Sequence, residues 1–388
     1  MTRLILLPYA GSSVGGSYVS SAQVAGYIQR HIGYECRVLL PEQGRNDDLF
    51  RFVGLTPHYY HLGDGQTVKL YQTRGFGPKL AALPAHLLML KTAVSQIRYH
   101  QPDLIHINDS RSLLAWALAA RYWRIPVLWQ VRGAEGNYYL DRMRLKLSDH
   151  LIFVSDAIRE RFGQTARPPN VTIYNAVNFD RFHPPSEQGV AKKNLGLNPS
   201  VFTLGQVANL LWYKRPEWAV QTVIDLHRAG HEVAFIHCGD DPTQGEYENR
   251  LRQMVAAAGL NSYFHFLGYC AEAEKVMQAL DILLLTSTAK GEAFPRVAIE
   301  AMACGTAVLT TRCGGVAEAI ENGRNGIIVD ANDYPALLNA AEQLVTQPDY
   351  RQQLAETAVT TVRARFSLEQ ISQQVAAVYS KMLDQKEQ

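Results

Sequence analysis

Short apolar runs alternate with helical stretches along the whole chain, and this alternation constrains the fold more than any other feature. In the first half, amphipathic segments such as 19–32 and 111–122 lie between strand-like runs at 4–7, 37–40, 104–107, 127–131 and 151–154. Runs of this length, separated by helices, are typical of buried parallel strands with crossover connections. The sequence therefore predicts an α/β protein built on parallel sheets.

A second series of the same kind follows a proline-rich polar segment at residues 182–189, which is typical of an interdomain linker. Its strand-like runs are 203–207, 232–237, 263–266, 281–286, 306–310 and 326–329, with helical stretches at 217–229, 247–258, 273–279 and 334–345. We therefore expect two Rossmann-like domains, 1–185 and 190–367. A last amphipathic helix at about 368–388 could cross back to the first domain, and a ligand cleft is expected where the strand ends of the two domains face each other.

Composition excludes several classes of protein. The formal net charge of +2 gives no argument for wholesale nucleic-acid binding. The five cysteines are scattered without CxxC spacing, which favours reduced thiols over a metal site or disulfides. No apolar run is long enough to span a bilayer, and the first run, at 4–7, is too short for a secretory signal. We expect a cytoplasmic enzyme.

The segment from 291 to 315 carries the clearest chemical signal. Glu292 precedes a predicted helix over 297–304, and Glu300 lies inside it among apolar residues. The first N–H groups of a helix have no partner within the helix and can bind an anion. A carboxylate in so apolar a helix, such as that of Glu300, should face solvent or have a specific partner. This combination suits a ligand that carries both hydroxyls and phosphates.

Two other segments could bind phosphate. The loop after the first strand contains Gly15 and Gly16, which would let a phosphate approach the next helix, although a flexible surface loop fits the residues equally well. Lys214 and Arg215 stand between a strand and a helix and suit a departing diphosphate. A solvated basic turn is the alternative there.

Further candidates are weaker. His106 ends a first-domain strand, where active-site groups are common in this architecture, but a structural histidine is as consistent. Arg142, Arg144 and Lys146, and the stretch 79–100 with its cations, could touch an anionic membrane; ordinary solvated helix faces are the favoured alternative. No group of side chains has metal-ligand spacing, and no motif indicates a covalent nucleophile.

Several motifs together resemble the retaining glycosyltransferases of family 4, which have the GT-B fold. They are Glu292-Ala293-Phe294-Pro295 with Glu300-Ala301-Met302-Ala303-Cys304-Gly305, followed by Gly314-Gly315, then Gln206-Val207-Ala208-Asn209 with Lys214, Asn175-Ala176-Val177-Asn178, Asp103–His106 and Gly15-Gly16. The second domain matches over nearly its full length. The first matches mainly in pattern, as expected for a domain that binds a variable acceptor.

The resemblance implies a role for each matched position. Glu300 would bind the nucleotide ribose, and Glu292 would contact donor-sugar hydroxyls. Lys214 would neutralise the diphosphate leaving group, helped by Gly16. Backbone groups of Ala293, Phe294 and Pro295 would hold sugar and phosphate, and the base would lie near Gly268. Asn209 and Arg215 would belong to the phosphate-binding segment, and His106 would be a catalytic candidate. Many members have arginine at the position of Asn209 and histidine at that of Arg132, so the roles of these two residues stay open.

The resulting hypothesis is a retaining, metal-independent hexosyltransferase without a cofactor. Its co-substrate would be a nucleotide sugar, with UDP- or GDP-sugars favoured, and its acceptor a glycan or lipid-linked molecule of bacterial surface polysaccharide or lipopolysaccharide synthesis. Peripheral contact with the inner face of the plasma membrane would fit this role. Two alternatives are a sugar-nucleotide epimerase or hydrolase of the same fold and a non-enzymatic two-domain ligand-binding protein.

Overall fold

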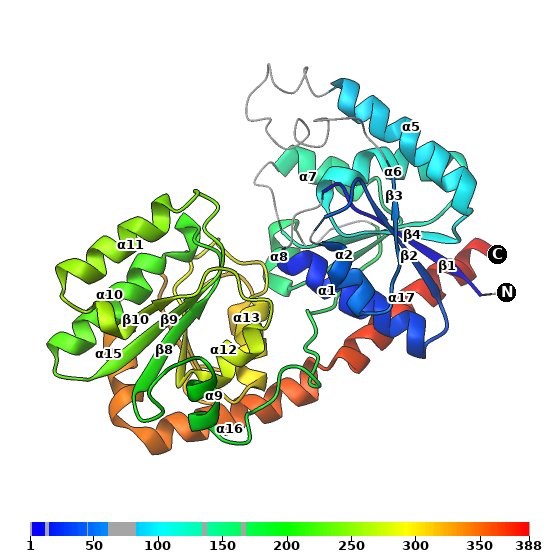
Figure 1. The fold of residues 1–388 in the computed structure, drawn as a ribbon. Coiled ribbons are helices and arrows are strands. Elements are labelled where there is room, and N and C mark those ends of the chain that lie inside the picture. Colours follow the sequence, from blue (N-terminus) through cyan, green and yellow to red (C-terminus); the bar gives the residue numbers. More distant parts are fainter. Residues whose placement is uncertain are drawn as a thin grey trace. The chain divides into compact units, whose positions relative to one another are not determined.

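The chain forms two compact units in a computed structural model (Figure 1). The structure describes residues 2–11, 15–44, 46–60, 83–133, 138–163 and 168–387. Unit 1 comprises Met1–Ala176 together with Leu368–Gln388, and unit 2 comprises Val177–Ser367. The segment predicted as a linker, residues 182–189, lies inside unit 2.

Unit 1 contains a sheet whose strand pairings are all parallel, in the order β3-β2-β1-β4-β5-β6-β7. The strands are β1 (Leu4–Pro8), β2 (Glu35–Leu40), β3 (Pro57–Tyr59), β4 (Leu104–Ile107), β5 (Val127–Val131), β6 (His150–Phe153) and β7 (Asn170–Thr172). The chain starts in the middle, builds one edge and then returns to build the other. The strand order therefore reverses between β1 and β4.

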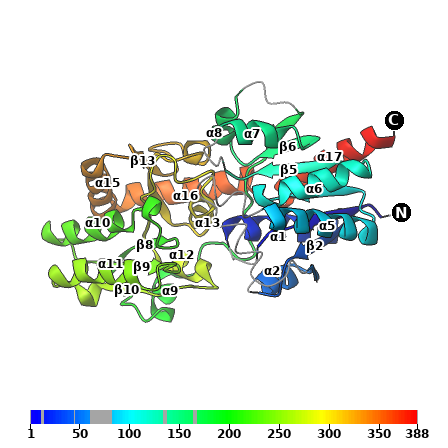
Figure 2. The same ribbon diagram turned by 90° about the horizontal axis from the view of Figure 1, so that it is seen from above.

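Helices cover both faces of this sheet (Figures 1 and 2). They are α1 (Gly16–His31), α2 (Asn46–Phe52), α5 (Leu83–His100), α6 (Ser110–Tyr122), α7 (Tyr138–Leu145), α8 (Asp156–Arg161) and α17 (Leu368–Glu387). Helices α1 and α17 pack on one face over a core that includes Ile5, Val38 and Tyr379. Helices α5 and α6 pack side by side on the other face.

Unit 2 has the same architecture around a parallel sheet of order β10-β9-β8-β11-β12-β13. Its strands are β8 (Phe202–Val207), β9 (Val233–Cys238), β10 (Phe264–Phe266), β11 (Ile282–Leu285), β12 (Ala307–Thr311) and β13 (Ile327–Val329). The order reverses between β8 and β11. In open parallel sheets, ligands bind at the carboxyl ends of the strands beside such a reversal.

The helices of unit 2 follow the predicted alternation. They are α9 (Gln188–Asn194), α10 (Pro216–Arg228), α11 (Glu246–Ala257), α12 (Ala273–Ala279), α13 (Arg296–Ala303), α14 (Val316–Ala319), α15 (Tyr334–Thr346) and α16 (Pro348–Arg365). A short 3-10 helix, Trp212–Lys214, lies between β8 and α10. The helix predicted over 297–304 is α13, and it begins one residue earlier.

The last helix, α17, returns to unit 1 as the sequence predicted. The chain leaves unit 2 close to the point where it enters that unit. There the Val177 N–H donates a hydrogen bond to the Phe366 carbonyl at 2.8 Å. Tyr379, in the middle of α17, is 1% exposed and packs against α1 and the sheet. The helix is therefore part of the core of unit 1.

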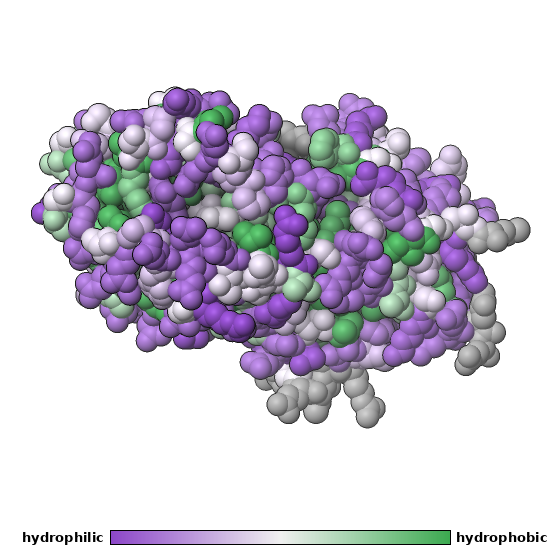
Figure 3. All heavy atoms as spheres, turned by 90° about the horizontal axis from the view of Figure 1, so that it is seen from below, coloured by the Kyte–Doolittle hydropathy of each residue, from purple (hydrophilic) through white to green (hydrophobic). Residues whose placement is uncertain are grey.

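The surface is mixed in character. On the face drawn in Figure 3, hydrophilic residues predominate and hydrophobic residues form separate patches. Among the described residues, no helix combines the length and the apolar character that crossing a membrane requires.

Candidate functional site

The strongest candidate site lies where the strand order of unit 2 reverses. The segment after β8 ends in the 3-10 helix that contains Lys214, and the segment after β11 contains Glu292. Because β8 and β11 are neighbouring parallel strands, their following loops meet at the same sheet edge. Two residues far apart in sequence are thereby brought together.

Lys214 and Glu292 form an ion pair at this edge. The Lys214 ammonium contacts Glu292 Oε1, and the Ser287 hydroxyl donates to the same oxygen at 3.0 Å. The two side chains are only 16% and 12% exposed. A partly buried cation of this kind interacts strongly with any anion that reaches it, because little water screens the charge.

A hydrogen-bond network fixes the backbone on which Lys214 stands. The Thr286 hydroxyl lies 2.8 Å from the carbonyl oxygens of both Lys214 and Arg215, and Gln206 Nε2 donates to Thr286 Oγ1 at 3.0 Å. The Thr288 N–H donates to the Tyr213 carbonyl at 2.7 Å. The two loops are thus joined through their backbones as well as through the ion pair.

Gly314 allows a third loop to pass over Glu292. Its φ is +44°, and a Cβ built there would lie 1.9 Å from the Glu292 carbonyl oxygen. The neighbouring Gly315 N–H donates to the Ala293 carbonyl at 3.0 Å. The Gly314-Gly315 pair therefore holds the backbone of Glu292 and Ala293 from the side of β12.

We expect Gly314→Ala to destabilise unit 2 by about 2–5 kcal/mol, through left-handed backbone strain plus steric overlap. The displaced Glu292 should also lower turnover. Denaturant unfolding and steady-state kinetics would measure both effects. Gly323→Ala is the matched control, because its φ is +77° but the nearest atom to an added Cβ is 3.8 Å away. Equal losses in the two variants would contradict the steric argument.

Glu300 lies on α13 and is 7% exposed. Its partner is Arg296, one turn earlier, whose guanidinium contacts Glu300 Oε1. The pair explains how a carboxylate is accommodated in an apolar helix. Phe294 is 5% exposed and packs against Phe366, and Pro295 caps α13, so this segment is fixed at the start of the helix.

Arg215 is directed toward a different set of residues. Its guanidinium donates to the Ala331 carbonyl and to Asn332 Oδ1, and lies 4.6 Å from the centre of the Trp218 ring. Its backbone has the unusual φ of +45° and caps α10. The contacts of Arg215 thus differ from those of Lys214, and its predicted role in phosphate binding stays a prediction.

Asn209 and Gly268 each accept a hydrogen bond from the backbone that follows β9, at the carboxyl edge of the sheet. Asn209 Oδ1 accepts from the Asp240 N–H at 3.1 Å, and the Gly268 carbonyl accepts from the Gly239 N–H at 2.8 Å. A Cβ at Gly239 would lie 2.0 Å from the Ala208 carbonyl oxygen. The loops after β8, β9 and β10 are therefore tied together here.

In unit 1, the corresponding strand-order reversal lies between β1 and β4. Gly15 precedes α1, which begins at Gly16, while residues 12–14 of the predicted phosphate loop lie outside the described residues. Asp109 follows β4, caps α6 and accepts from the Ala10 N–H at 3.0 Å. The first loop is thus joined to the start of α6.

His106 is buried beneath this edge. It is 3% exposed, and its Nδ1 lies 2.7 Å from the Tyr379 hydroxyl of α17. This arrangement is the structural alternative considered for His106, and it gives no support to contact with a substrate.

Arg132, at the end of β5, donates to amide oxygens of Asn108, Gln130 and Asn175 at 2.9–3.2 Å. It joins the carboxyl ends of β4 and β5 to the segment that follows β7.

Burial should make the stability of the protein sensitive to acid through His106. Desolvation, with the nearby Arg132 charge, lowers the pKa of His106 to about 3. Between that value and the unfolded pKa of about 6.5, only the unfolded chain binds the proton, so stability should fall as pH decreases, by up to ~1.4 kcal/mol per pH unit. Burial also lowers the pKa of His237 to about 4, which adds to the fall.

Denaturant unfolding of the wild type and of His106→Gln, measured from pH 4 to 7.5, would test this dependence. The variant should show a shallower pH slope, whatever its absolute stability. Superimposable slopes would contradict the assignment of acid sensitivity to His106.

Two of the buried cysteines are unreactive at neutral pH, as their pKa values show. Burial raises the pKa of Cys313 to about 12, with a contribution from Glu292, and burial also raises the pKa of Cys36 to about 12. Both thiols thus stay protonated at neutral pH. The five cysteines are free, and the described residues contain no His, Cys, Asp and Glu group suited to a metal ion.

Sequence reasoning gave no role to the residues that support Lys214 and Glu292, although Gln206 stands in one of the motifs that carry the family resemblance. Gln206, Thr286 and Ser287 stand directly at the ends of apolar strand runs, where polar side chains reach the carboxyl edge. That position was the available signal. The partner of Glu300 could also have been found, since Arg296 lies at the i,i+4 spacing that favours a helical ion pair.

Family models cover most of the chain. The model described as glycosyl transferases group 1 matches residues 188–360, and the model described as Glycosyltransferase Family 4 matches residues 14–181. The two matches correspond to the bulk of unit 2 and of unit 1.

Individual relatives agree with the models. The lipopolysaccharide core biosynthesis mannosyltransferase LpsB of Rhizobium meliloti (strain 1021) is 25% identical over 357 residues, covering 85% of this chain and 97% of that protein. LpcC of Rhizobium leguminosarum bv. viciae, also a lipopolysaccharide core biosynthesis mannosyltransferase, is 29% identical over 300 residues, covering 70% and 84%. Anabaena HepE, solved with UDP and glucose, shares the fold at a TM-score of 0.81 and 24% identity, covering 98% and 100%. The chain therefore belongs to glycosyltransferase family 4 and has the GT-B fold.

Proposed function

We propose that the protein transfers a sugar from a nucleotide-sugar donor to a glycan or lipid-linked acceptor with retention of anomeric configuration. The ion pair between Lys214 and Glu292 at the strand-order reversal of unit 2 is the observation that carries this proposal. It combines a cation for a diphosphate with a carboxylate for hydroxyls. The relatives that are lipopolysaccharide core mannosyltransferases favour an acceptor of bacterial surface polysaccharide synthesis.

The resting ion pair would be exchanged for donor contacts. When a diphosphate reaches the site, Lys214 would turn from Glu292 to the phosphate oxygens, and Glu292 would accept hydrogen bonds from sugar hydroxyls. Since negative charge on the diphosphate grows as the glycosidic bond breaks, a fixed cation stabilises the transition state more than the bound donor. Ser287 would keep Glu292 in place during this exchange, since it bonds the carboxylate without using Lys214.

We propose that the remaining site residues bind the nucleotide. The start of α13 offers backbone N–H groups and a helix dipole to phosphate. Glu300 on the same helix would bind the ribose, and the loop at Gly268 would hold the base. We also propose that Gly16, at the start of α1, contacts the diphosphate. UDP- and GDP-sugars are the favoured donors.

Retention would follow from attack on the side of the leaving group. The bond from the anomeric carbon to the phosphate oxygen would break as the acceptor oxygen bonds to that carbon, and the acceptor proton would pass to the departing phosphate oxygen. Lys214 would supply the positive charge, so we propose that no divalent metal is required. The anomeric configuration of the product, read by NMR, distinguishes retention from inversion.

A thermal-shift panel of UDP-, GDP- and ADP-sugars would test the donor, run with and without EDTA. A donor present at about a hundred times its dissociation constant should stabilise the fold by roughly 2.7 kcal/mol. We expect one UDP- or GDP-sugar to raise the melting temperature, equally in EDTA, and Lys214→Ala to abolish that rise. The absence of a response to any nucleotide sugar, or a response only with divalent metal, would contradict the proposal.

A further inference from the structure

Arg296 is the first residue of α13, and it stands where a helix disfavours a cation. The N-terminal end of a helix carries partial positive charge, so acidic residues are preferred in its first turn. The first turn of α13 contains none. Arg296 also precedes its partner Glu300 in the chain, which is the less favourable order for an ion pair within a helix. The stability of the helix therefore gives no reason for a cation at this position.

The pair between Arg296 and Glu300 is well shielded from solvent. Its side chains are 13% and 10% exposed, whereas those of Arg252 and Glu248, a pair at the same spacing on α11, are 50% and 24% exposed. The pair on α11 also has the favourable order, with its carboxylate nearer the start of the helix. Charges that are withdrawn from water lose hydration, so the buried pair contributes less stability than its contact suggests. An anionic ligand at the start of α13 would offset this unfavourable placement.

Two ion pairs stand at the start of α13. One joins Lys214 to Glu292, which lies just before the helix, and the other joins Arg296 to Glu300. The proposed function assigns hydroxyls to both carboxylates, those of the sugar to Glu292 and those of the ribose to Glu300. Because hydroxyls are neutral, each carboxylate that binds them leaves its cation available for another anion. In a nucleotide sugar the diphosphate links the sugar to the ribose, so it lies between the two ion pairs.

We propose that Arg296 is the second cation of the diphosphate site and that the ribose releases it from Glu300. This inference rests on the proposed function, since it takes a nucleotide sugar as the ligand. The Cβ of a helical residue tilts toward the helix N-terminus, so the guanidinium of Arg296 reaches Glu300 by turning back along the helix. Turned the other way, the guanidinium lies at the helix start, where backbone N–H groups also attract phosphate. A guanidinium can bind phosphate through paired hydrogen bonds, which a lysine does not form.

This exchange makes the site distinguish a nucleotide from a nucleoside. A nucleoside has to displace Arg296 from Glu300 without offering an anion in return. A nucleoside diphosphate offers hydroxyls to Glu300 and phosphate oxygens to Arg296, so both charges keep a partner. Arg215 does not supply the second cation, because its guanidinium bonds Ala331 and Asn332.

Isothermal titration calorimetry of the full chain with UDP and with uridine tests the exchange, and GDP with guanosine covers the other favoured base. Arg296→Gln should weaken UDP or GDP binding by about 10-fold, the loss expected for a hydrogen bond to a charged group. It should tighten binding of the matching nucleoside by about threefold, because Glu300 no longer has to leave a cation. Arg296→Lys keeps the charge without the paired hydrogen bonds, so its nucleotide affinity should lie between those of the wild type and Arg296→Gln.

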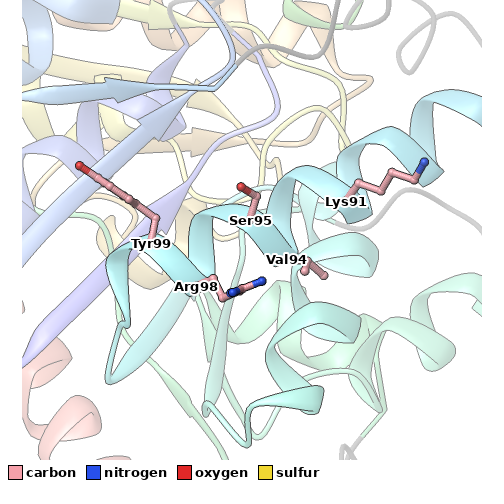
Figure 4. A pocket seen from close by; sticks show the side chains of 5 residues that line it. All are labelled: Lys91, Val94, Ser95, Arg98 and Tyr99. Carbon is pink, nitrogen blue, oxygen red and sulfur yellow. The ribbon is translucent and has the colours of Figure 1, made fainter.

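Two arginines elsewhere serve as controls. Arg252→Gln is the matched one, since it removes an arginine from a helical ion pair at the same spacing on α11. Arg98→Gln removes an arginine of unit 1 that lines the shallow hollow on α5 drawn in Figure 4. Both variants should bind nucleotides and nucleosides within about twofold of the wild type, since local ion pairs and surface cations contribute little.

A second pair of variants keeps the test sharp if Arg296→Gln is too unstable to titrate, since that change leaves the Glu300 carboxylate buried without its partner. Arg296→Gln/Glu300→Gln carries neither charge and is compared with Glu300→Gln. Both lose the ribose carboxylate, so both should bind uridine weakly. The affinity for UDP relative to uridine should nevertheless be about 10-fold lower in the double variant, which lacks Arg296.

Equal weakening of nucleotide and nucleoside binding in Arg296→Gln would show that the arginine only orients Glu300, and would overturn the inference. Unchanged nucleotide binding in this variant would overturn it as well. A wild-type protein that binds none of the four ligands would overturn the proposed function and this inference together. Nucleotide binding that depends on Lys214 but not on Arg296 would overturn the inference alone, so the two failures are distinguishable.

Discussion

Replacing Lys214 with alanine is expected to lower kcat by about 10²- to 10³-fold, the loss typical when one preorganised electrostatic contact to a developing charge is removed. The Lys214 ammonium is the cation that contacts Glu292 at the strand-order reversal. Without it, a diphosphate would have to leave with less compensation of its growing charge. UDP or GDP should also bind more weakly, as measured by isothermal titration calorimetry alongside steady-state kinetics.

Arg215→Ala is the control for this loss, because the adjacent guanidinium bonds Ala331 and Asn332 instead. It should lower the melting temperature, with kcat within about threefold of the wild type. A circular-dichroism melt of Lys214→Ala should show an intact fold, since the backbone carbonyl of Lys214 retains its bond to Thr286. Full activity of Lys214→Ala, or a larger kinetic loss in Arg215→Ala, would reverse the assignment of the two cations.

Replacing Glu292 with glutamine should have effects of opposite sign on binding and on turnover. The resting carboxylate competes with the diphosphate for Lys214, so the neutral amide should let UDP or GDP bind severalfold more tightly. Turnover should nevertheless fall by about 10²-fold, because the sugar hydroxyls lose a charged hydrogen-bond acceptor. Titration of the nucleotide and measurement of kcat with the full donor would separate the two effects.

Ser287→Ala provides a graded comparison, since it removes one hydrogen bond at 3.0 Å and leaves the charge of Glu292. Its turnover should lie between those of the wild type and Glu292→Gln. Glu272→Gln, an exposed carboxylate paired with Lys275, should be indistinguishable from the wild type. Weaker nucleotide binding in Glu292→Gln would show that the carboxylate does not compete for Lys214.

Much of the fold could be predicted because parallel strands are buried on both faces and so appear as short apolar runs. Every predicted strand is present, with ends shifted by at most a few residues. Strands β3 and β7 were missed because they are short edge strands whose residues, such as His58 and Asn170, are polar. Helix α16 was missed as well, and its polar surface and few buried residues explain why periodicity gave little signal.

The candidate site was harder to predict because its geometry depends on contacts between loops. The sequence supplied Lys214 and Glu292 as separate motifs, and only the neighbouring positions of β8 and β11 bring them together. The direction of the Arg215 guanidinium depends on Ala331 and Asn332, more than a hundred residues later. Burial of His106 depends on Tyr379 of α17, which lies 273 residues later in the chain. Such long-range partners leave no local pattern.

The return of α17 to unit 1 has a consequence for the order of folding during synthesis. Domains generally fold as units while the chain emerges, the amino-terminal one first. Here the core of unit 1 includes Ile371, Val375, Tyr379 and Met382, which follow all of unit 2 in the chain. Unit 2, which is one continuous segment, has its whole core available earlier. Unit 1 therefore begins before unit 2 and is completed after it, and its α1 surface stays uncovered until α17 has been made.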